Sequence, residues 1–266
     1  MWLPLGKLEY RKETGKPLTR FLAALQFLTI IAIPWRREPQ ADELGRSAGF
    51  FPVVGLIIGL ILVGLYWLFG LLLPPMVVAA LLVASLAVIS GAIHLDGFAD
   101  TCDGLASHKT VEERWQVMHD SRAGAFGIVG VVLLLLIKYA SLTSIPAASM
   151  MMALVLMPVV SRWAMAYALF AYPYARPSGL GKALQQGTRW PGFTMATIIT
   201  VAIAAVIANL IGLAILFFSW VVTLVAAAYF KSKFKGLTGD NYGAINEVVE
   251  VSVLIFITIL ARFGLA

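Results

Sequence analysis

The chain has little charge and almost no cysteine. Only 13% of its 266 residues are charged, whereas 60% are hydrophobic, and an ordinary soluble domain carries about 25% charged residues. This composition excludes an ordinary soluble domain and indicates a membrane protein. The single cysteine, Cys102, excludes an internal disulfide and a cysteine-based metal finger. The net charge of +6 does not indicate a nucleic-acid partner, because the rest of the chain is too apolar to stay in solution.

Sequence patterns of several common classes are also missing. The chain has no short alternating segments of an outer-membrane barrel, and no P-loop, H-E-x-x-H or paired C-x-x-C motif. Its basic N-terminal segment lacks the cleavage pattern of a signal peptide. The apolar stretches are instead long enough to cross a bilayer as helices, which takes about 20 residues. We therefore expect an all-α, polytopic membrane bundle that forms a single integral domain, residues 1–266.

Continuous apolar stretches predict seven transmembrane helices. They cover residues 48–73, 76–93, 124–144, 146–171, 192–210, 213–230 and 247–264. Of the 20 basic residues, 17 lie outside these stretches and all flank the same side, which places the long loops in the cytoplasm and the C-terminus outside. An eighth stretch, 21–33, is short and has basic residues on both flanks. We expect it to be a re-entrant or interfacial helix.

Three aspartates lie close together at the cytoplasmic end of one predicted span, in the sequence H-L-D-G-F-A-D-T-C-D-G. At 100° per residue, Asp96, Asp100 and Asp103 lie within about 60° of one another on one helix face. Carboxylates so close repel one another, and a divalent cation relieves that repulsion. Oxygen ligands of this kind suit Mg²⁺ or Mn²⁺ bound together with a substrate phosphate. The alternative is an acidic surface patch or a favourable helix N-terminus.

Other residues of the same segment surround these aspartates. Gly97 and Gly104 would let a bulky phosphate ester approach the backbone. His94 would lie on the opposite side of the helix, where a structural role is the alternative to contact with a substrate. A separate pair, Gly55 and Gly59, forms G-x-x-x-G and predicts close packing between helices.

The next motif, M-H-D-S-R-A-G-A-F-G, opens the following span. Asp120 could supply a fourth carboxylate, and the planar guanidinium of Arg122 could clamp phosphate oxygens. The free N–H groups of the helix start also favour an anion. Helix capping by Asp120 and charge anchoring by Arg122 are the alternatives.

Further candidate residues come from three later segments. Arg176 lies in a glycine-rich cytoplasmic loop, and Asp240 in T-G-D-N-Y-G. Arg162 lies inside a span, where a charge is costly and marks a functional site by default, although Glu250 could be its structural partner. Asn246 and Glu250 are four residues apart and share a helix face, where they could bind metal, ribose or an amide-rich ligand. The alternative there is a turn followed by a helix start.

Together these motifs resemble the cobalamin synthase family, the adenosylcobinamide-GDP ribazoletransferases. The similarity runs almost end to end and includes F-x-A-A-L-x-F-L-T, F-P-V-V-G, the acidic segment, D-S-R-x-G-x-F-G and T-G-D. The acidic segment and D-S-R-x-G-x-F-G are the specific ones. Cys102 stands where a small residue is usual and Asn241 where an aliphatic residue is expected, but neither is a candidate ligand.

The resemblance implies the joining of adenosylcobinamide-GDP to alpha-ribazole or its 5′-phosphate. The products are adenosylcobalamin, or its 5′-phosphate, and GMP, and the reaction depends on Mg²⁺. Under this interpretation Asp96, Asp100 and Asp103 hold the metal, and Asp103 or Asp120 takes the hydroxyl proton. The phosphate is stabilised by Arg122 and Arg176.

The resemblance also implies a multi-pass protein of the bacterial cytoplasmic membrane whose site faces the cytoplasm. Its expected partners are the two substrates and the lipid bilayer, and no nucleic acid is expected. The resemblance does not decide whether the protein forms a homo-oligomer. The candidate substrate-binding residues are His94, Arg162, Arg176, Asp240, Asn246 and Glu250.

Two rival functions compete with this interpretation. A CDP-alcohol phosphotransferase also uses membrane aspartates and Mg²⁺, but its motif reads D-G-x-x-A-R, and here Asp100 occupies the place of the alanine and Thr101 that of the arginine. A cation-coupled transporter binds its ion near the bilayer midplane between inverted repeats. Here the aspartates lie at the membrane edge, and no repeat is present.

Overall fold

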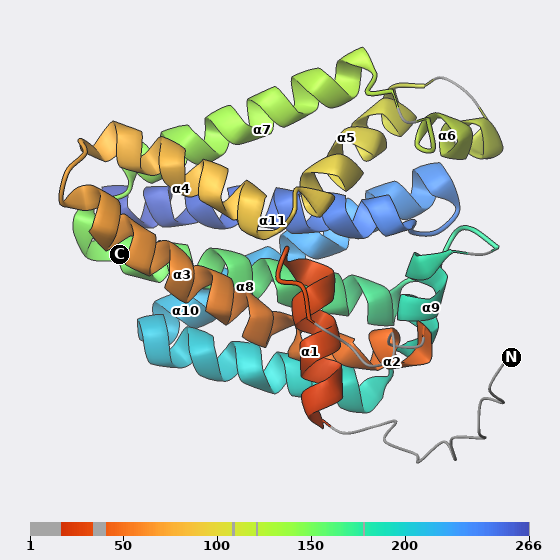
Figure 1. Cartoon of the computed structure of the whole chain (residues 1–266), viewed down its shortest axis with the longest axis horizontal. Helices are drawn as coiled ribbons and strands as arrows, with labels where there is room; N and C mark the ends of the chain where they lie inside the picture. Colours follow the sequence, from red (N-terminus) through yellow and green to blue (C-terminus); the bar gives the residue numbers. More distant parts are fainter. Residues whose placement is uncertain (1–16, 34–40, 108–109, 121, 178, 266) are drawn as a thin grey trace, which may run out of the picture.

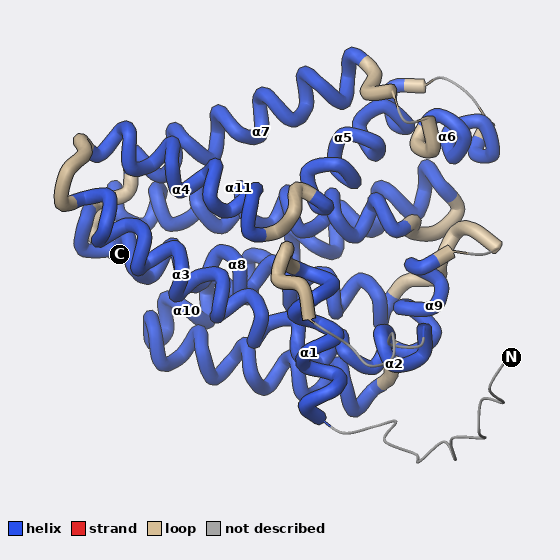
Figure 2. The backbone as a smooth tube through the Cα atoms, in the orientation of Figure 1, coloured by secondary structure: helices blue, strands red, loops and turns tan. Residues whose placement is uncertain are grey.

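The computed structural model describes residues 17–33, 41–107, 110–120, 122–177 and 179–265. Regular structure in this part of the chain is helical, and no strand occurs in it (Figures 1 and 2). The predicted all-α class is confirmed. The helices are α1 (Pro17–Leu28), α2 (Ala41–Arg46), the 3₁₀ helix η1 (Ser47–Phe50), α3 (Phe51–Gly70), α4 (Pro75–Ile89), α5 (Ile93–Ala106), α6 (Val111–Val117), α7 (Ala125–Ser144), α8 (Ala147–Ala171), α9 (Leu180–Gly187), α10 (Trp190–Phe234) and α11 (Gly239–Arg262).

Five helical segments are long and apolar enough to cross a membrane. They are Glu43–Gly70, which includes α3, and helices α7, α8, α10 and α11. If the bent pair of α4 and α5 forms one broken span, the number of candidate spans in the described part of the chain is six. These findings establish a polytopic helical membrane protein, whereas the total of seven crossings stays a prediction.

α10 contains the two predicted spans 192–210 and 213–230 in one 45-residue element. Its backbone leaves helical geometry at Ala208 and at Asn209, where φ is 48°. A Cβ on Gly212 would lie 2.0 Å from the carbonyl oxygen of Ala204, although eight residues of straight helix span about 12 Å. The chain therefore turns back on itself at this break, where the sequence predicts a loop.

The predicted span 76–93 is wrong at its C-terminal end. α4 ends at Ile89, and the next residues include Gly91 (φ 62°) and Ala92 (φ 55°), both left-handed. α5 then leaves at 90° to α4. The three aspartates of the acidic segment thus lie on a separate short helix and not on the end of a long span.

α8 forms the centre of the bundle, with 89% of its most apolar 18-residue window buried (Figure 1). α3 packs closely against it, because a Cβ on Gly55 would meet the backbone of Pro158 at 2.3 Å, and a Cβ on Gly59 would meet Val155 at 2.8 Å. The helix-packing interpretation of G-x-x-x-G is confirmed. These contacts hold α3 and α8 together through bare backbone, as is common between membrane helices.

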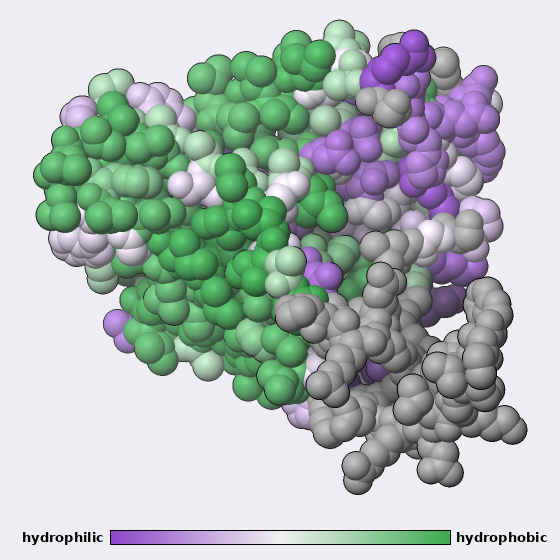
Figure 3. Space-filling model, in the orientation of Figure 1, coloured by the Kyte–Doolittle hydropathy of each residue, from purple (hydrophilic) through white to green (hydrophobic). Residues whose placement is uncertain are grey.

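Polar and apolar surfaces separate along the long axis of the molecule. Figure 3 shows hydrophobic side chains over α3, α4 and α7, and hydrophilic side chains gathered over α5 and α6 at one end. The C-terminal end of α11 lies at the opposite end (Figure 1). α1 has 12 residues, too few to span about 30 Å of hydrocarbon, as expected for a re-entrant or interfacial helix.

Candidate functional site

The acidic helix α5 carries Asp96, Asp100 and Asp103, as the spacing predicts. Asp96 is exposed, and the other two are half-buried. Asp240, at the start of α11, acts electrostatically on Asp100 together with Asp96 and Asp103. Four carboxylates from two helices therefore form one negative region at the hydrophilic end of the molecule.

Asp103 holds the N-terminus of the next helix. Its two carboxylate oxygens accept hydrogen bonds from the backbone N–H groups of Gly124 and Gly127, each at 2.8 Å. A Cβ on Gly127 would come within 2.5 Å of the same carboxylate, so this position must stay small. Free N–H groups at a helix start favour a negative charge. Here a side chain of the protein, and not a substrate phosphate, meets that preference.

The glycines of the acidic segment serve helix packing. A Cβ on Gly97 would meet the backbone of Asp240 at 2.8 Å, and one on Gly104 would meet the side chain of Met118 at 2.7 Å. At Gly104 the space beside the backbone is therefore filled by protein, whereas Gly97 also lines the cavity described below, so its approach by a phosphate ester stays a prediction. Close contact at Gly97 is what brings the starts of α5 and α11 together.

A short backbone contact places Arg176 beside Asp240. The backbone of Leu237 exchanges hydrogen bonds with Pro173 (2.9 Å) and Ala175 (2.8 Å), which joins the loop after α8 to the loop before α11. Arg176 Nη2 then lies 3.0 Å from Asp240 Oδ2. Two segments more than 60 residues apart in the sequence thus contribute an arginine and an aspartate to one place.

A cavity of about 390 Å³ opens at this place, within the range of small-molecule sites. Among the predicted site residues it is lined by His94, Asp96, Arg176 and Asp240. Further lining comes from Phe27, Ile93, Gly97, His119, Met165, Leu169, Tyr174, Gly179, Gly181, Leu184, Gly239, Tyr242 and Gly243. The structure therefore assembles one site from helices α1, α5, α8, α9 and α11 and from the loops between them.

Three residues of this cavity were not identified from the sequence. His119, next to Asp120, lines the cavity and acts electrostatically on Asp240. Tyr174 and Tyr242 also line it, and burial raises the pKa of the Tyr174 phenol, which keeps that hydroxyl protonated. The only sequence signal for His119 was its place inside the motif M-H-D-S-R, and the tyrosines gave none.

Asp120 and Arg122 pair with each other outside the cavity lining. Arg122 donates to Asp120 through Nε (3.0 Å), Nη2 (2.8 Å) and its backbone N–H (3.0 Å). These hydrogen bonds lower the pKa of Asp120 to about 2. The pair is exposed, so it is accessible to a ligand, but neither residue faces the cavity in this arrangement.

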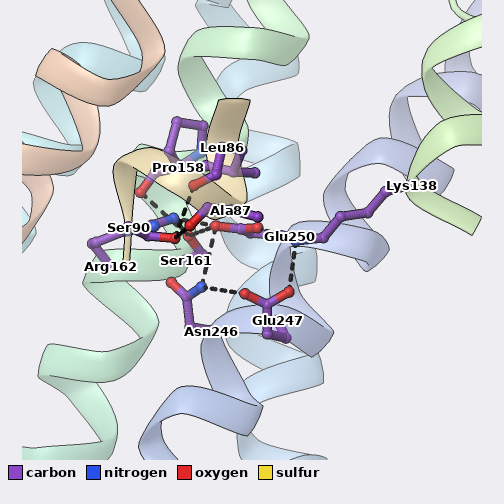
Figure 4. A network of polar contacts seen from close by, with 10 residues as sticks. All are labelled: Leu86, Ala87, Ser90, Lys138, Pro158, Ser161, Arg162, Asn246, Glu247 and Glu250. Carbon is purple, nitrogen blue, oxygen red and sulfur yellow. Dashed lines mark hydrogen bonds and ion pairs between the residues drawn. The ribbon is translucent and has the colours of Figure 1, made fainter. Parts of the chain in front are cut away.

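Four charged residues form an intramembrane ion cluster between α7, α8 and α11, namely Lys138, Arg162, Glu247 and Glu250 (Figure 4). Glu250 pairs with Arg162, and its other oxygen lies 2.5 Å from Lys138 Nζ. Glu247 also pairs with Lys138, at 2.6 Å. The structural partner foreseen for Arg162 is confirmed.

Asn246 belongs to this cluster through a 3.1 Å hydrogen bond to Glu250. Asn246, Arg162 and Glu250 are fully buried and do not line the cavity. The structure thus separates these three predicted substrate-binding residues from the cavity, and ties them to one another.

The predicted metal ligands do not form a complete ligand set by themselves. Within the described part of the chain, no group of three or more His, Cys, Asp or Glu side chains is arranged to hold a metal ion. Mg²⁺ commonly takes only one or two carboxylates and completes its shell with water and substrate phosphate. The oxygen-only donors of Asp96, Asp100 and Asp240 fit that second kind of site.

Comparison with known proteins identifies the family. Residues 20–258 match the family model described as cobalamin-5-phosphate synthase. A protein of Geotalea daltonii named adenosylcobinamide-GDP ribazoletransferase is 39% identical over 93% of this chain and 99% of its own length. Proteins with the same name from a Roseiflexus species and Pseudomonas savastanoi are 37% and 36% identical, over 91% and 90% of this chain and 90% and 99% of their own. No solved structure matches. The resemblance inferred from the motifs is confirmed, and the chain belongs to the cobalamin-5-phosphate synthase family.

Proposed function

We propose that the chain is a magnesium-dependent adenosylcobinamide-GDP ribazoletransferase. The observation that carries this proposal is the near full-length similarity to relatives of that name. The cavity supports it, because acidic, basic and apolar groups converge there at the hydrophilic end of a membrane bundle. We place that end in the cytoplasm, since the basic loops gather there. We propose that the membrane is the bacterial cytoplasmic membrane.

The reaction is a substitution at phosphorus. A hydroxyl oxygen of alpha-ribazole, or of its 5′-phosphate, bonds to the cobinamide-side phosphorus of adenosylcobinamide-GDP. The bond between that phosphorus and the bridging oxygen breaks, and GMP leaves with the bridging oxygen. The proton of the attacking hydroxyl passes to a base. Such a transfer needs alignment and charge neutralisation more than covalent chemistry from the protein.

Cationic and acidic groups of the cavity suit these tasks. Arg176 is held by Asp240 with its guanidinium at the cavity wall, where it can bind a phosphate oxygen. Mg²⁺, when bound to Asp100 or Asp240, would neutralise charge on the pyrophosphate. Of the two predicted proton acceptors, Asp103 is occupied by two N–H groups and Asp120 by Arg122. Asp96 is exposed and lines the cavity, and we propose it as the base.

The test uses the full-length chain in detergent with adenosylcobinamide-GDP, alpha-ribazole and Mg²⁺. We expect GMP and the joined corrinoid to appear together, to depend on Mg²⁺ and to vanish with EDTA. The Asp100→Ala variant should lose at least about 100-fold in rate, because it removes a carboxylate that would hold the cation that offsets transition-state charge. Its melting temperature should match wild type, since Asp100 is only half-buried. A folded wild-type protein that releases no GMP from intact substrates would contradict the proposal, and CDP-alcohol substrates would then be tried.

A further inference from the structure

The cavity changes character from its mouth to its interior. Asp96 and His119 are exposed, and Arg176 and Asp240 are partly exposed, so the two aspartates, the arginine and this histidine line the mouth. The buried side chains of the lining, its glycines apart, are those of Met165, Leu169, Leu184, His94 and Tyr242. The interior is therefore apolar apart from one imidazole and one phenol.

These two interior polar groups lack partners in the described part of the chain. His94 is 2% exposed, and neither of its ring nitrogens makes a hydrogen bond. Tyr242 is 3% exposed, and its hydroxyl is likewise unpaired. Buried polar groups in folded proteins are nearly always hydrogen-bonded. Two unpaired groups at the lining of one cavity therefore point to a ligand that completes them.

We propose that this interior binds the aromatic base of the acceptor nucleoside. Either the Tyr242 hydroxyl or the His94 imidazole donates a hydrogen bond to the free ring nitrogen of the base, and the apolar side chains cover its faces and edges. The ribose and any phosphate then lie at the mouth, beside Arg176 and His119. This inference rests on the proposed function and deepens it, because it names the subsite for the acceptor.

The polarity of the interior selects between the two aromatic bases of the reaction. Guanine carries a carbonyl, a ring N–H, an amine and further ring nitrogens along its edges, which all need partners when buried. The benzimidazole of alpha-ribazole has one free ring nitrogen, and its other edge carries only methyl groups. An interior with only two polar side chains can serve the one free ring nitrogen of the benzimidazole, and it leaves guanine largely unpaired.

Equilibrium binding to the full-length chain in detergent tests this assignment. The two probes are alpha-ribazole and the matching indole riboside, in which C–H replaces the free ring nitrogen. We expect wild type to bind alpha-ribazole about tenfold more tightly, the usual worth of one hydrogen bond. Tyr242→Phe or His94→Phe should remove most of this preference. The variant should bind alpha-ribazole more weakly than wild type does and should bind the indole riboside with unchanged affinity. Tyr66→Phe, at a separate cavity, is the matched control and should change neither.

Several outcomes would overturn the assignment. One is equal affinity of wild type for the two probes, and another is a preference that survives in both single variants, with folding checked by thermal melting. A third is active protein in which the variants raise the KM for adenosylcobinamide-GDP and leave that for alpha-ribazole unchanged, because the cavity would then hold guanine. If the binding pattern is as expected and no GMP is released, the proposed function fails and the base site stands.

Discussion

Two groups of charged side chains in this protein are built in opposite ways. In the intramembrane ion cluster, two carboxylates and two cations are fully buried, and each charge has a partner of opposite sign. On α5 and the start of α11, four aspartates gather around the cavity end with Arg176 as the cation that pairs with one of them. The first group is balanced, and the second carries excess negative charge.

The difference follows from solvent access. A charge without water is tolerated only when it is paired, and each charge of the buried cluster has a partner of opposite sign within the protein. The half-exposed aspartates keep water and can exchange it for a cation. His94 lies between the two groups, because it lines the cavity and also interacts electrostatically with Arg162, Glu250 and Lys138. The cluster therefore lies close enough to the cavity to act electrostatically on one of its lining side chains.

The largest expected effect comes from breaking the balanced cluster. Glu250→Gln leaves the buried cations Arg162 and Lys138 with Glu247 as their remaining carboxylate, and removing one partner of a buried pair costs about 3–5 kcal/mol. We expect a strongly lowered melting temperature in detergent. Glu112→Gln is the control, since its 3.8 Å contact with Lys235 joins two exposed side chains. A Glu250→Gln protein that melts like wild type but binds substrate poorly would return Glu250 to the binding residues.

The sequence was sufficient to predict most residues of both charged groups, but not how these residues come together in space. Apolar lengths predicted the helices α7, α8 and α11, and the cost of an intramembrane arginine predicted a partner such as Glu250. Lys138 had no interpretation, because its partners are 109 and 112 residues away. Hydropathy could not show the left-handed residues that turn α5 by 90°.

The cavity could be predicted only in part for the same reason. Asp96, Arg176 and Asp240 stand out as charges in an apolar chain, so their residue types alone mark them. Tyr242 resembles any aromatic residue of a membrane helix until α5 and α8 are placed around it. Asn241, which departs from the family pattern, shows how context decides, because its amide caps α11 through Thr238 and donates to Thr101 at 3.0 Å.

An intermediate effect is expected within the acidic helix itself. Asp103→Ala removes the acceptor of two backbone N–H groups at the start of α7 and should cost about 1–2 kcal/mol, as for loss of a helix cap. Asp96→Ala, on the same helix but exposed, should leave the free energy of unfolding unchanged within about 0.5 kcal/mol. Both variants should lower GMP release. Equal stability of the two would mean that the hydrogen bonds from Gly124 and Gly127 do not anchor α7.

The smallest effect on stability is expected at the exposed pair of Asp120 and Arg122. Arg122 holds the pKa of Asp120 at about 2, below the ordinary 3.8, so the pairing stabilises the fold above pH 3.8 and is lost as the pH falls through 2. Arg122→Ala should return this pKa toward 3.8, measured by NMR titration of labelled aspartate, without a measurable change in melting at pH 7. Because the guanidinium is 87% exposed, a phosphate can replace Asp120 as its partner. If Arg122→Ala raises the KM for adenosylcobinamide-GDP and leaves the melting temperature unchanged, Arg122 binds substrate. Unchanged kinetics would mean that Arg122 only stabilises the local turn.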